Sequence, residues 1–318
     1  MSLLRLLPAF VLTFFIAATV IARDDTGKPS TSSNAVVSSA ITGGLLDSAV
    51  PIEHRRKLAD QLIELAERER SPQLFYMLGS LYRQGDADGI APFPQDIDRA
   101  RDYLTRAAVA GHLAAMSKLA RLELDSGNQF RANLWAQLYV HYSALEDPAK
   151  TANPKPLRAP TGNDNEAALL LALTLDGFPK SDIPRLTERA NDMLARYDTA
   201  IRTYIKEQKE EEQKTSFPRT SARTATNVAS TQLLAQLGRE VKWASAEYFV
   251  EFSADGSFLR AWPFDGWPEH KVLPALKLIV NGYVLDPAPA GTTENRVVVI
   301  PVLYINQNYR PKQTNDTE

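Results

Sequence analysis

Apolar residues recur every three or four positions from Pro51 to about Glu212, which is the period of an α-helix with one buried face. The first such stripe consists of four residues: Leu58, Leu62, Leu65 and Ala66. Ser71 followed by Pro72 is typical of a helix start, and Gly85 is typical of a helix end. The pattern therefore predicts a run of amphipathic helices that pack against one another.

The helices that follow have boundary signals of the same kind. Asp96 can cap a helix that ends at Gly111. Gly127 and its neighbour separate two further apolar stretches, over residues 113–124 and 128–144. We therefore predict four short helices in two antiparallel pairs.

The first of these pairs resembles the Sel-one-like repeats, which are short relatives of the tetratricopeptide repeat. The matching residues are Leu78, Gly79, Tyr82, Gly85, Ala100, Tyr103, Ala107, Ala108 and Gly111. The resemblance implies a solenoid adaptor that presents a concave face to a protein or peptide and has no chemistry of its own. A helical domain that only supports the rest of the chain is the alternative, because only two repeat units are visible and a sizeable groove needs about three.

The helical region continues to about residue 213. Four prolines between residues 146 and 163 predict a long surface loop. A strongly apolar helix follows over 166–175, and a longer amphipathic helix over 182–212. The predicted helical-repeat domain therefore spans residues 51–213.

The period changes from helical to alternating beyond residues 214–231, a polar stretch that we interpret as a linker between domains. Alternating apolar residues from Tyr248 to Phe252, followed by the turn signal at Asp255, predict the first half of a β-hairpin. The second strand begins at Phe258. We therefore predict a second domain over residues 232–306.

The order of elements in this second domain is strand, strand, helix, strand. Its helix is expected over residues 269–281 and its last strand over 296–305. That order predicts a small sheet with a helix packed across one face. The predicted fold class is thus an all-α helical-repeat (α-α solenoid) domain followed by a small α+β domain.

Several residues of the second domain resemble the C-terminal domain of the TonB family of energy transducers. The matching residues are Tyr248, Val250, Phe252, Asp255, Gly256, Phe258, Leu273, Ala275, Leu276, Pro287, Ala288 and the closing run from Ile300 to Tyr304. The resemblance implies that a free sheet edge pairs with a short strand from a partner, through backbone hydrogen bonds. The candidate partner-binding edge is formed by Arg296, Val298, Ile300, Val302 and Tyr304; a purely structural strand is the alternative.

Aromatic residues are concentrated in the same domain, which contains Trp243, Trp262 and Trp267. A domain of under about 100 residues needs large side chains to bury enough area, so we expect these tryptophans in the core. Trp262, Phe264 and Trp267 form a candidate aromatic patch for protein contact if they are exposed together.

The two ends of the chain differ from its middle. Residues 6–22 are apolar, follow Arg5 and end in small residues, which predicts an export signal peptide over 1–22 and a periplasmic protein. An uncleaved segment would instead anchor the chain in the inner membrane, as in a TonB-type energy transducer of a transport system. Residues 23–50 and 307–318 are polar and are expected to be a disordered spacer and tail.

The amino-acid composition limits the kinds of functional site that the chain can form. The 36 Lys and Arg residues against 38 Asp and Glu give a net charge of −2, which excludes the basic field that nucleic-acid binding needs. The chain has no cysteine, and its four histidines are scattered. We therefore expect no catalytic, cofactor or metal site, and predict a non-enzymatic scaffold that binds other envelope proteins or peptides.

Overall fold

The computed structural model describes residues 33–86, 89, 91–146, 162–214, 243–268, 272–288, 291, 293 and 295–305. Within these residues the protein is mostly helical, with a small antiparallel sheet near the C-terminus. The chain divides into a helical unit, Thr19–Phe217, and a second unit that contains Pro218–Glu318. The predicted signal peptide, the linker beyond its first residue and the C-terminal tail lie outside the described residues.

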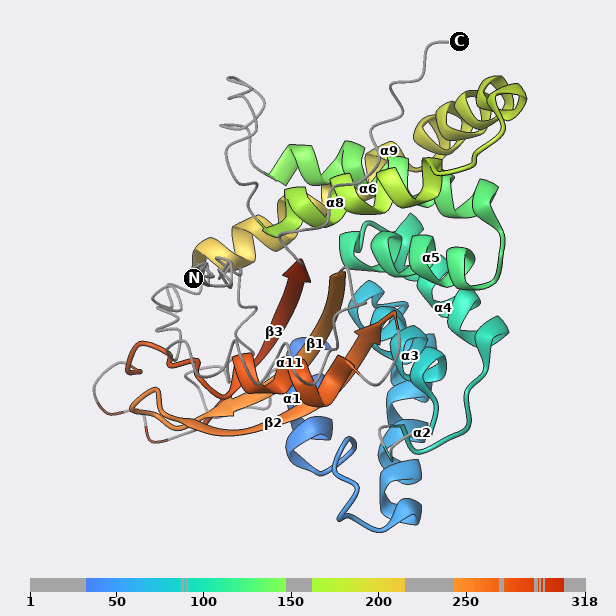
Figure 1. Ribbon diagram of the computed structural model, residues 1–318. Helices are drawn as coiled ribbons and strands as arrows, with labels where there is room; N and C mark the ends of the chain where they lie inside the picture. The colour runs from blue at the N-terminus through green and yellow to red at the C-terminus, as the bar shows by residue number, and fades with distance from the viewer. Residues whose placement is uncertain are drawn as a thin grey trace, which may run out of the picture. The chain divides into compact units, whose positions relative to one another are not determined.

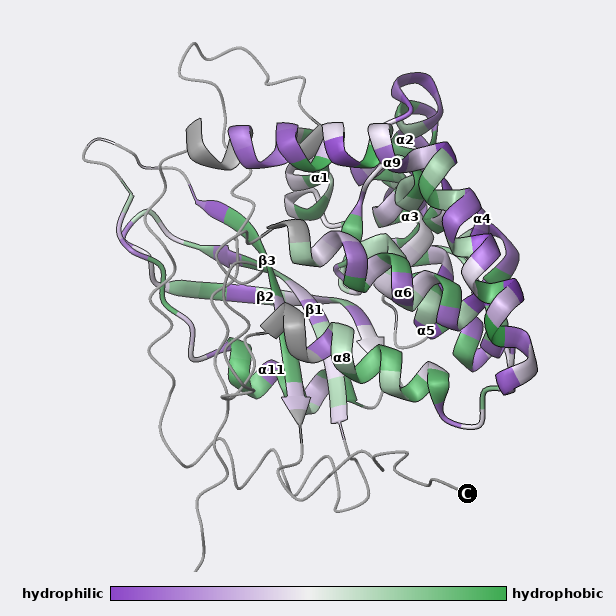
Figure 2. Cartoon of the chain, turned by 90° about the horizontal axis from the view of Figure 1, so that it is seen from above, coloured by the Kyte–Doolittle hydropathy of each residue, from purple (hydrophilic) through white to green (hydrophobic). Residues whose placement is uncertain are grey.

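The helical unit consists of antiparallel neighbours that follow one another in chain order (Figure 1). Its described helices are α1 (Ser33–Thr42), α2 (Ile52–Glu69), α3 (Pro72–Gln84), α4 (Ile97–Val109), α5 (Leu113–Asp125), α6 (Gln129–Glu146), α8 (Gly162–Leu175) and α9 (Ile183–Lys214). A short 3₁₀ turn, Lys180–Asp182, leads into α9. Hydrophilic and hydrophobic stretches alternate along α9 (Figure 2), as expected for a helix with one buried face.

The helix boundaries lie where the sequence signals predicted them. The Ser71 hydroxyl accepts a hydrogen bond from the Leu74 amide at the start of α3, and Asp96 Oδ1 accepts one from the Arg99 amide at the start of α4. Gly85 ends α3 with φ +67°, a left-handed conformation that favours glycine. The cap predictions are confirmed.

The paired helices α3 and α4 pack through aromatic rings and charged side chains. The rings of Tyr82 and Tyr103 stack with centroids 5.8 Å apart. Arg106 of α4 lies 3.9 Å from the centre of the Phe75 ring and donates two hydrogen bonds to Glu67 of α2 (2.7 and 2.6 Å). Burial raises the pKa of Tyr103 to about 12. Arg106 thus joins α2, α3 and α4.

The prediction of a disordered spacer through residue 50 is wrong for its second half. Residues from Ser33 onward form α1 and a following turn, and four apolar side chains there are buried: Val37, Ile41, Leu45 and Leu46. Val37 and Ile41 are one helical turn apart, so a single face of α1 carries the apolar groups that a mostly polar composition obscured.

The second unit contains a three-stranded antiparallel sheet of β1 (Trp243–Phe252), β2 (Phe258–Trp267) and β3 (Arg296–Ile305), in the order β2-β1-β3. The helix α11 (Val272–Val280) stands between β2 and β3 in the sequence. The predicted strand-strand-helix-strand order is confirmed. However, β1 begins five residues before Tyr248, where the alternating pattern was first visible.

The apolar helix α11 packs across one face of this sheet (Figures 1 and 2). The Tyr248 hydroxyl donates to the Leu273 carbonyl. A Cβ atom added to Gly266, which pairs with Ala246, would lie 2.8 Å from Leu273 Cδ2. The even-numbered side chains of β1 therefore face α11, and the odd-numbered ones face the other way.

Candidate functional site

The strand β3 lies at an edge of the sheet, because its one described neighbour is β1. It pairs with β1 over its full length, from Arg296 opposite Phe252 to Ile305 opposite Trp243, without a register shift. An edge strand offers backbone N–H and C=O groups on its outer side to another chain. The candidate partner-binding strand is thus an edge of this sheet among the described strands.

The opposite edge, β2, is irregular. Its pairing with β1 shifts register between Glu247 and Tyr248 and again between Glu251 and Phe252. It also carries Pro263, which has no backbone N–H. Bulges and prolines are the features by which proteins discourage pairing at an edge. The two edges therefore differ in register: β2 is bulged, whereas β3 pairs regularly with β1 and carries a proline of its own, Pro301.

The side chains of the five candidate residues of β3 do not face an outside partner. Arg296, Val298, Ile300, Val302 and Tyr304 are all buried, and the register places them on the face covered by α11. Arg296 donates a hydrogen bond to the Asp286 carbonyl (2.7 Å), and burial lowers the pKa of its guanidinium. The side chains of these residues fix the strand in the core and are not available to a partner.

The start of β3 is fixed by Glu251 of β1, which the sequence analysis did not single out. Its carboxylate accepts hydrogen bonds from Arg260 Nε (2.5 Å) and from Asn295 Nδ2 (2.8 Å), the residue just before β3. A carboxylate buried in a strand of mostly apolar residues needs hydrogen-bond or ion-pair partners that compensate for its loss of water. The position of Glu251 among the apolar residues of β1 is the sequence feature from which its role could have been predicted.

The expectation that the tryptophans of this domain are core residues is confirmed, and the condition for an aromatic contact patch is not met. Trp262, Phe264 and Trp267 are only 6%, 1% and 8% exposed. The ring of Trp267 lies 4.0 Å from that of Trp243, and Phe264 lies edge-on to Phe249 at 4.9 Å. Large aromatic side chains supply most of the area that a small unit can bury, so they are used for packing.

The repeat residues of the helical unit also serve packing. All nine residues are buried: Leu78, Gly79, Tyr82, Gly85, Ala100, Tyr103, Ala107, Ala108 and Gly111. Gly111 has φ +109°, and a Cβ atom there would lie 2.7 Å from Tyr204 Cβ of α9. Close helix approach thus accounts for the small residues.

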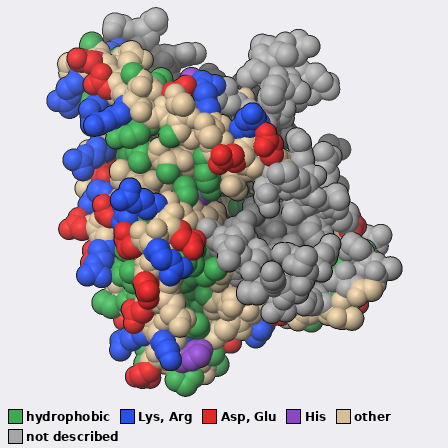
Figure 3. Space-filling view, turned by 180° about the vertical axis from the view of Figure 1, so that it is seen from behind, with side chains coloured by type: hydrophobic (Ala, Val, Ile, Leu, Met, Phe, Trp, Pro, Cys, Tyr) green, Lys and Arg blue, Asp and Glu red, His purple; other side chains and the backbone are tan. Residues whose placement is uncertain are grey.

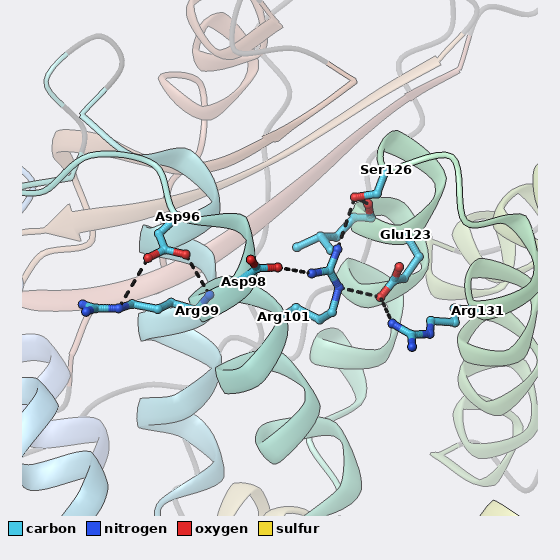
Figure 4. Close-up of polar contacts among 8 residues, drawn as sticks. Asp96, Asp98, Arg99, Arg101, Glu123, Ser126 and Arg131 are labelled. Carbon is cyan, nitrogen blue, oxygen red and sulfur yellow. Dashed lines mark hydrogen bonds and ion pairs between the residues drawn. The ribbon is translucent and has the colours of Figure 1, made fainter.

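A polar network connects α4, α5 and α6 (Figure 4). Arg101 of α4 donates to Glu123 of α5 (2.9 Å) and to Asp98 (2.6 Å), and Arg131 of α6 lies 4.0 Å from the same Glu123 oxygen. The Glu123 side chain is only 2% exposed. Because a buried carboxylate needs compensating partners, this network stabilises helix packing.

Charged side chains of both signs are intermixed on the face of the molecule shown in Figure 3. Among the described residues, several charged side chains form ion pairs within or between helices, such as Arg202 with Asp198 (2.7 Å). This distribution gives that face no extended area of one sign.

The described histidines are separate from one another. His112 stacks on Tyr76, with ring centroids 4.1 Å apart, and its Nε2 lies 2.8 Å from Gln73 Oε1. Across the described ranges, no group of three or more His, Cys, Asp or Glu side chains could hold a metal ion. His270 lies outside the described residues.

Comparison with known proteins gives no relative from which a function could be transferred. The sequence matches no protein-family model and no curated protein, and the structure matches no solved structure. No helix in the part of the chain that the structure describes has both the length and the hydropathy needed to cross a membrane. The apolar segment 6–22 is outside that part.

Proposed function

We propose that the protein is a non-enzymatic scaffold of the bacterial periplasm that binds other envelope proteins or peptides through two modules. The first is a helical domain similar to Sel-one-like repeats, and the second is a module similar to the TonB C-terminal domain. The export-type segment at residues 1–22 supports the location. The regular outer edge of β3 is the observation that carries the binding function.

The helical module supports the proposal through its construction from successive antiparallel pairs. In repeat proteins each pair packs on the next, and the stack offers an extended surface to a partner. Capping by Ser71 and Asp96 and the close packing around Gly79 and Tyr82 are the features that such pairs require.

The orientation of the backbone groups along β3 follows from Pro301. A proline in a sheet edge lies with its nitrogen away from the neighbouring strand, because a nitrogen facing β1 would cost a ladder hydrogen bond. Val299 and Leu303, two residues to either side, share the orientation of Pro301. We therefore infer that their backbone N–H groups point to the open edge and can donate to an extended peptide.

The experiment compares full-length Val299→Pro with Val299→Ala in affinity capture from an envelope extract. The proline variant removes one outward N–H donor, whereas the alanine variant keeps the donor and removes only side-chain atoms. We expect Val299→Pro to lose the captured partner and Val299→Ala to retain it.

The amide exchange of β1 serves as the control, since it reports whether the sheet is still intact in each variant. If both variants, with β1 still protected, captured the partner equally, binding through the β3 edge would be excluded. Equal loss in both variants would assign recognition to the side chain of Val299 instead of its backbone.

A further inference from the structure

On the face of the sheet opposite α11, exposure of the side chains increases from β2 to β3. In one row of paired residues, Trp262 of β2 and Phe249 of β1 are 6% and 1% exposed, whereas Val299 of β3 is half-buried. Leu303 of β3 is also half-buried, although its partner in β1, Ser245, is only 5% exposed. The accessible part of this face therefore lies along β3.

Three apolar side chains form this accessible part: Val299, Pro301 and Leu303, which we call the apolar ridge. All three are half-buried, and Val297, the preceding residue on the same face, is only 2% exposed. Four residue steps along a strand make the ridge about 13 Å long, so five residues of an adjacent strand would span it. Three side chains of such a strand would lie on the same face as the ridge.

The backbone of the ridge offers less to an added strand than a regular edge does. Val299 and Leu303 share the orientation of Pro301, so their N–H groups point outward. Pro301 itself presents a carbonyl and no N–H. The middle of an added strand thus finds an acceptor without a donor, and contacts between side chains supply a larger share of the binding.

The charges on the same face disfavour an acidic partner. Glu247 of β1 lies opposite Pro301, and Glu251 of β1 lies opposite Val297. An acidic side chain placed just outside β3 would lie about 10 Å, or two strand spacings, from this row of carboxylates. Its direct neighbours in β3 would be the uncharged residues of the ridge, so it would meet like charge without a cation beside it.

We propose that the partner strand at the edge of β3 carries three apolar side chains at alternate positions, which pack on the apolar ridge, and that aspartate and glutamate are excluded from these positions. Valine, isoleucine and leucine are the side chains that fit a half-buried strand surface of this kind. The inference rests on the proposed function, in which a partner pairs with β3, and it adds the class of residue that the partner presents.

Selection of a displayed library of random heptapeptides on the full-length protein tests the proposal. On the wild type, we expect valine, isoleucine and leucine to be enriched about two- to fivefold at each of three alternate positions, the factor that a favourable cross-strand pair supplies. Aspartate and glutamate should be depleted at the same positions. On Leu303→Lys, one of these positions should change its preference to aspartate or glutamate, because opposite charges on adjacent strands attract. Leu259→Lys is the matched control, since it places the same charge on an exposed apolar residue of β2, and it should keep the wild-type pattern.

Amide exchange of β1 reports whether the sheet is intact in each variant. If Leu303→Lys loses this protection, Val299→Lys at the other end of the ridge takes its place. Enriched peptides without alternating apolar residues, an unchanged pattern on the intact lysine variant, or no enriched peptide on the wild type would each overturn the proposal. The proposed function is tested separately by Val299→Pro: if this variant, with β1 still protected, selects the same peptides as the wild type, pairing with the β3 backbone is excluded.

Discussion

Leu104 of α4 lies so close to Gly79 of α3 that a Cβ atom added to the glycine would stand 2.6 Å from Leu104 Cγ. Real Cβ atoms do not approach other carbons this closely, so the two helices depend on a glycine at this position. The pair therefore defines the spacing of α3 and α4.

Gly79→Ala should destabilise the helical unit by about 1–3 kcal/mol through overpacking against Leu104. Urea unfolding followed by the helical circular-dichroism signal measures this change. In the Leu104→Ala background, where Cγ is absent, the penalty of Gly79→Ala should largely disappear. A stabilisation by about 0.5–1 kcal/mol, the gain of alanine over glycine in an unhindered helix, would contradict the close packing.

Glu123→Gln should cost about 1–3 kcal/mol, because it leaves Arg101 without its buried carboxylate while that arginine keeps some access to water. Asp98→Asn is the matched control, since it removes the other carboxylate that Arg101 contacts. Asp98 is almost fully exposed, so this change should stay within about 0.5 kcal/mol. Equal effects of the two substitutions in urea unfolding would argue against a special role for the buried pair.

The stability of the helical unit should depend on pH through Glu67. The hydrogen bonds from Arg106 hold the pKa of the Glu67 carboxyl below its ordinary value in the folded state. The unfolded chain therefore binds more protons on acidification, so this contribution is present above the ordinary glutamate pKa of about 4.3 and is lost as the pH falls through the folded value.

Glu67→Gln removes the titrating group and should flatten the fall in the urea midpoint between neutral and acidic pH. Glu64→Gln, one turn earlier on α2, is the control and should leave the acid profile as in the wild type. Identical acid profiles for the wild type and Glu67→Gln would show that the Arg106 contact does not persist in solution.

Tyr248→Phe should destabilise the second unit by about 1–2 kcal/mol, because the buried hydroxyl that donates to the Leu273 carbonyl is lost. Burial also raises the pKa of Tyr248, so the hydroxyl stays protonated and able to donate far into the alkaline range. Amide exchange of β1 measures the change. Tyr197→Phe, a half-buried position on α9, should leave that exchange unaltered.

The export segment predicts a mature chain that begins at Arg23. Mass spectrometry of the N-terminal peptide from the native protein measures this, and carbonate extraction of membranes measures anchoring. We expect release from the membrane pellet together with an N-terminus near residue 23. Retention in the pellet with residues 6–22 intact would support the membrane-anchored transducer instead.

Local signals in the sequence were reliable wherever neighbouring residues decide the outcome. Ser71, Asp96 and Gly85 bound their helices as predicted, because capping and positive φ involve only atoms within one turn. The alternating residues up to Phe252 and the turn at Gly256 likewise predicted the hairpin. The first five residues of β1 were missed because Ala244 and Ala246 are weak strand formers, so no strand pattern marks them.

The candidate site required contacts between residues distant in the sequence. Glu251 is fixed by Arg260 and Asn295, and the last of these lies 44 positions away. The sequence could not indicate which strand would be central, and it therefore could not distinguish the irregular edge at β2 from the regular edge at β3. Helix α1 was missed because a short polar segment becomes a helix only when its few apolar groups find a neighbour.

The sequence by itself determined the order of the helices and strands, the residues that end most of them and the absence of thiol chemistry, because these depend on backbone preferences and composition. Only the tertiary structure decided that β1 stands between the other two strands and that the five candidate side chains of β3 are buried on the face covered by α11. Strand order and burial follow from which distant segments pack together, and the free energy of that packing belongs to the whole fold and to no single segment.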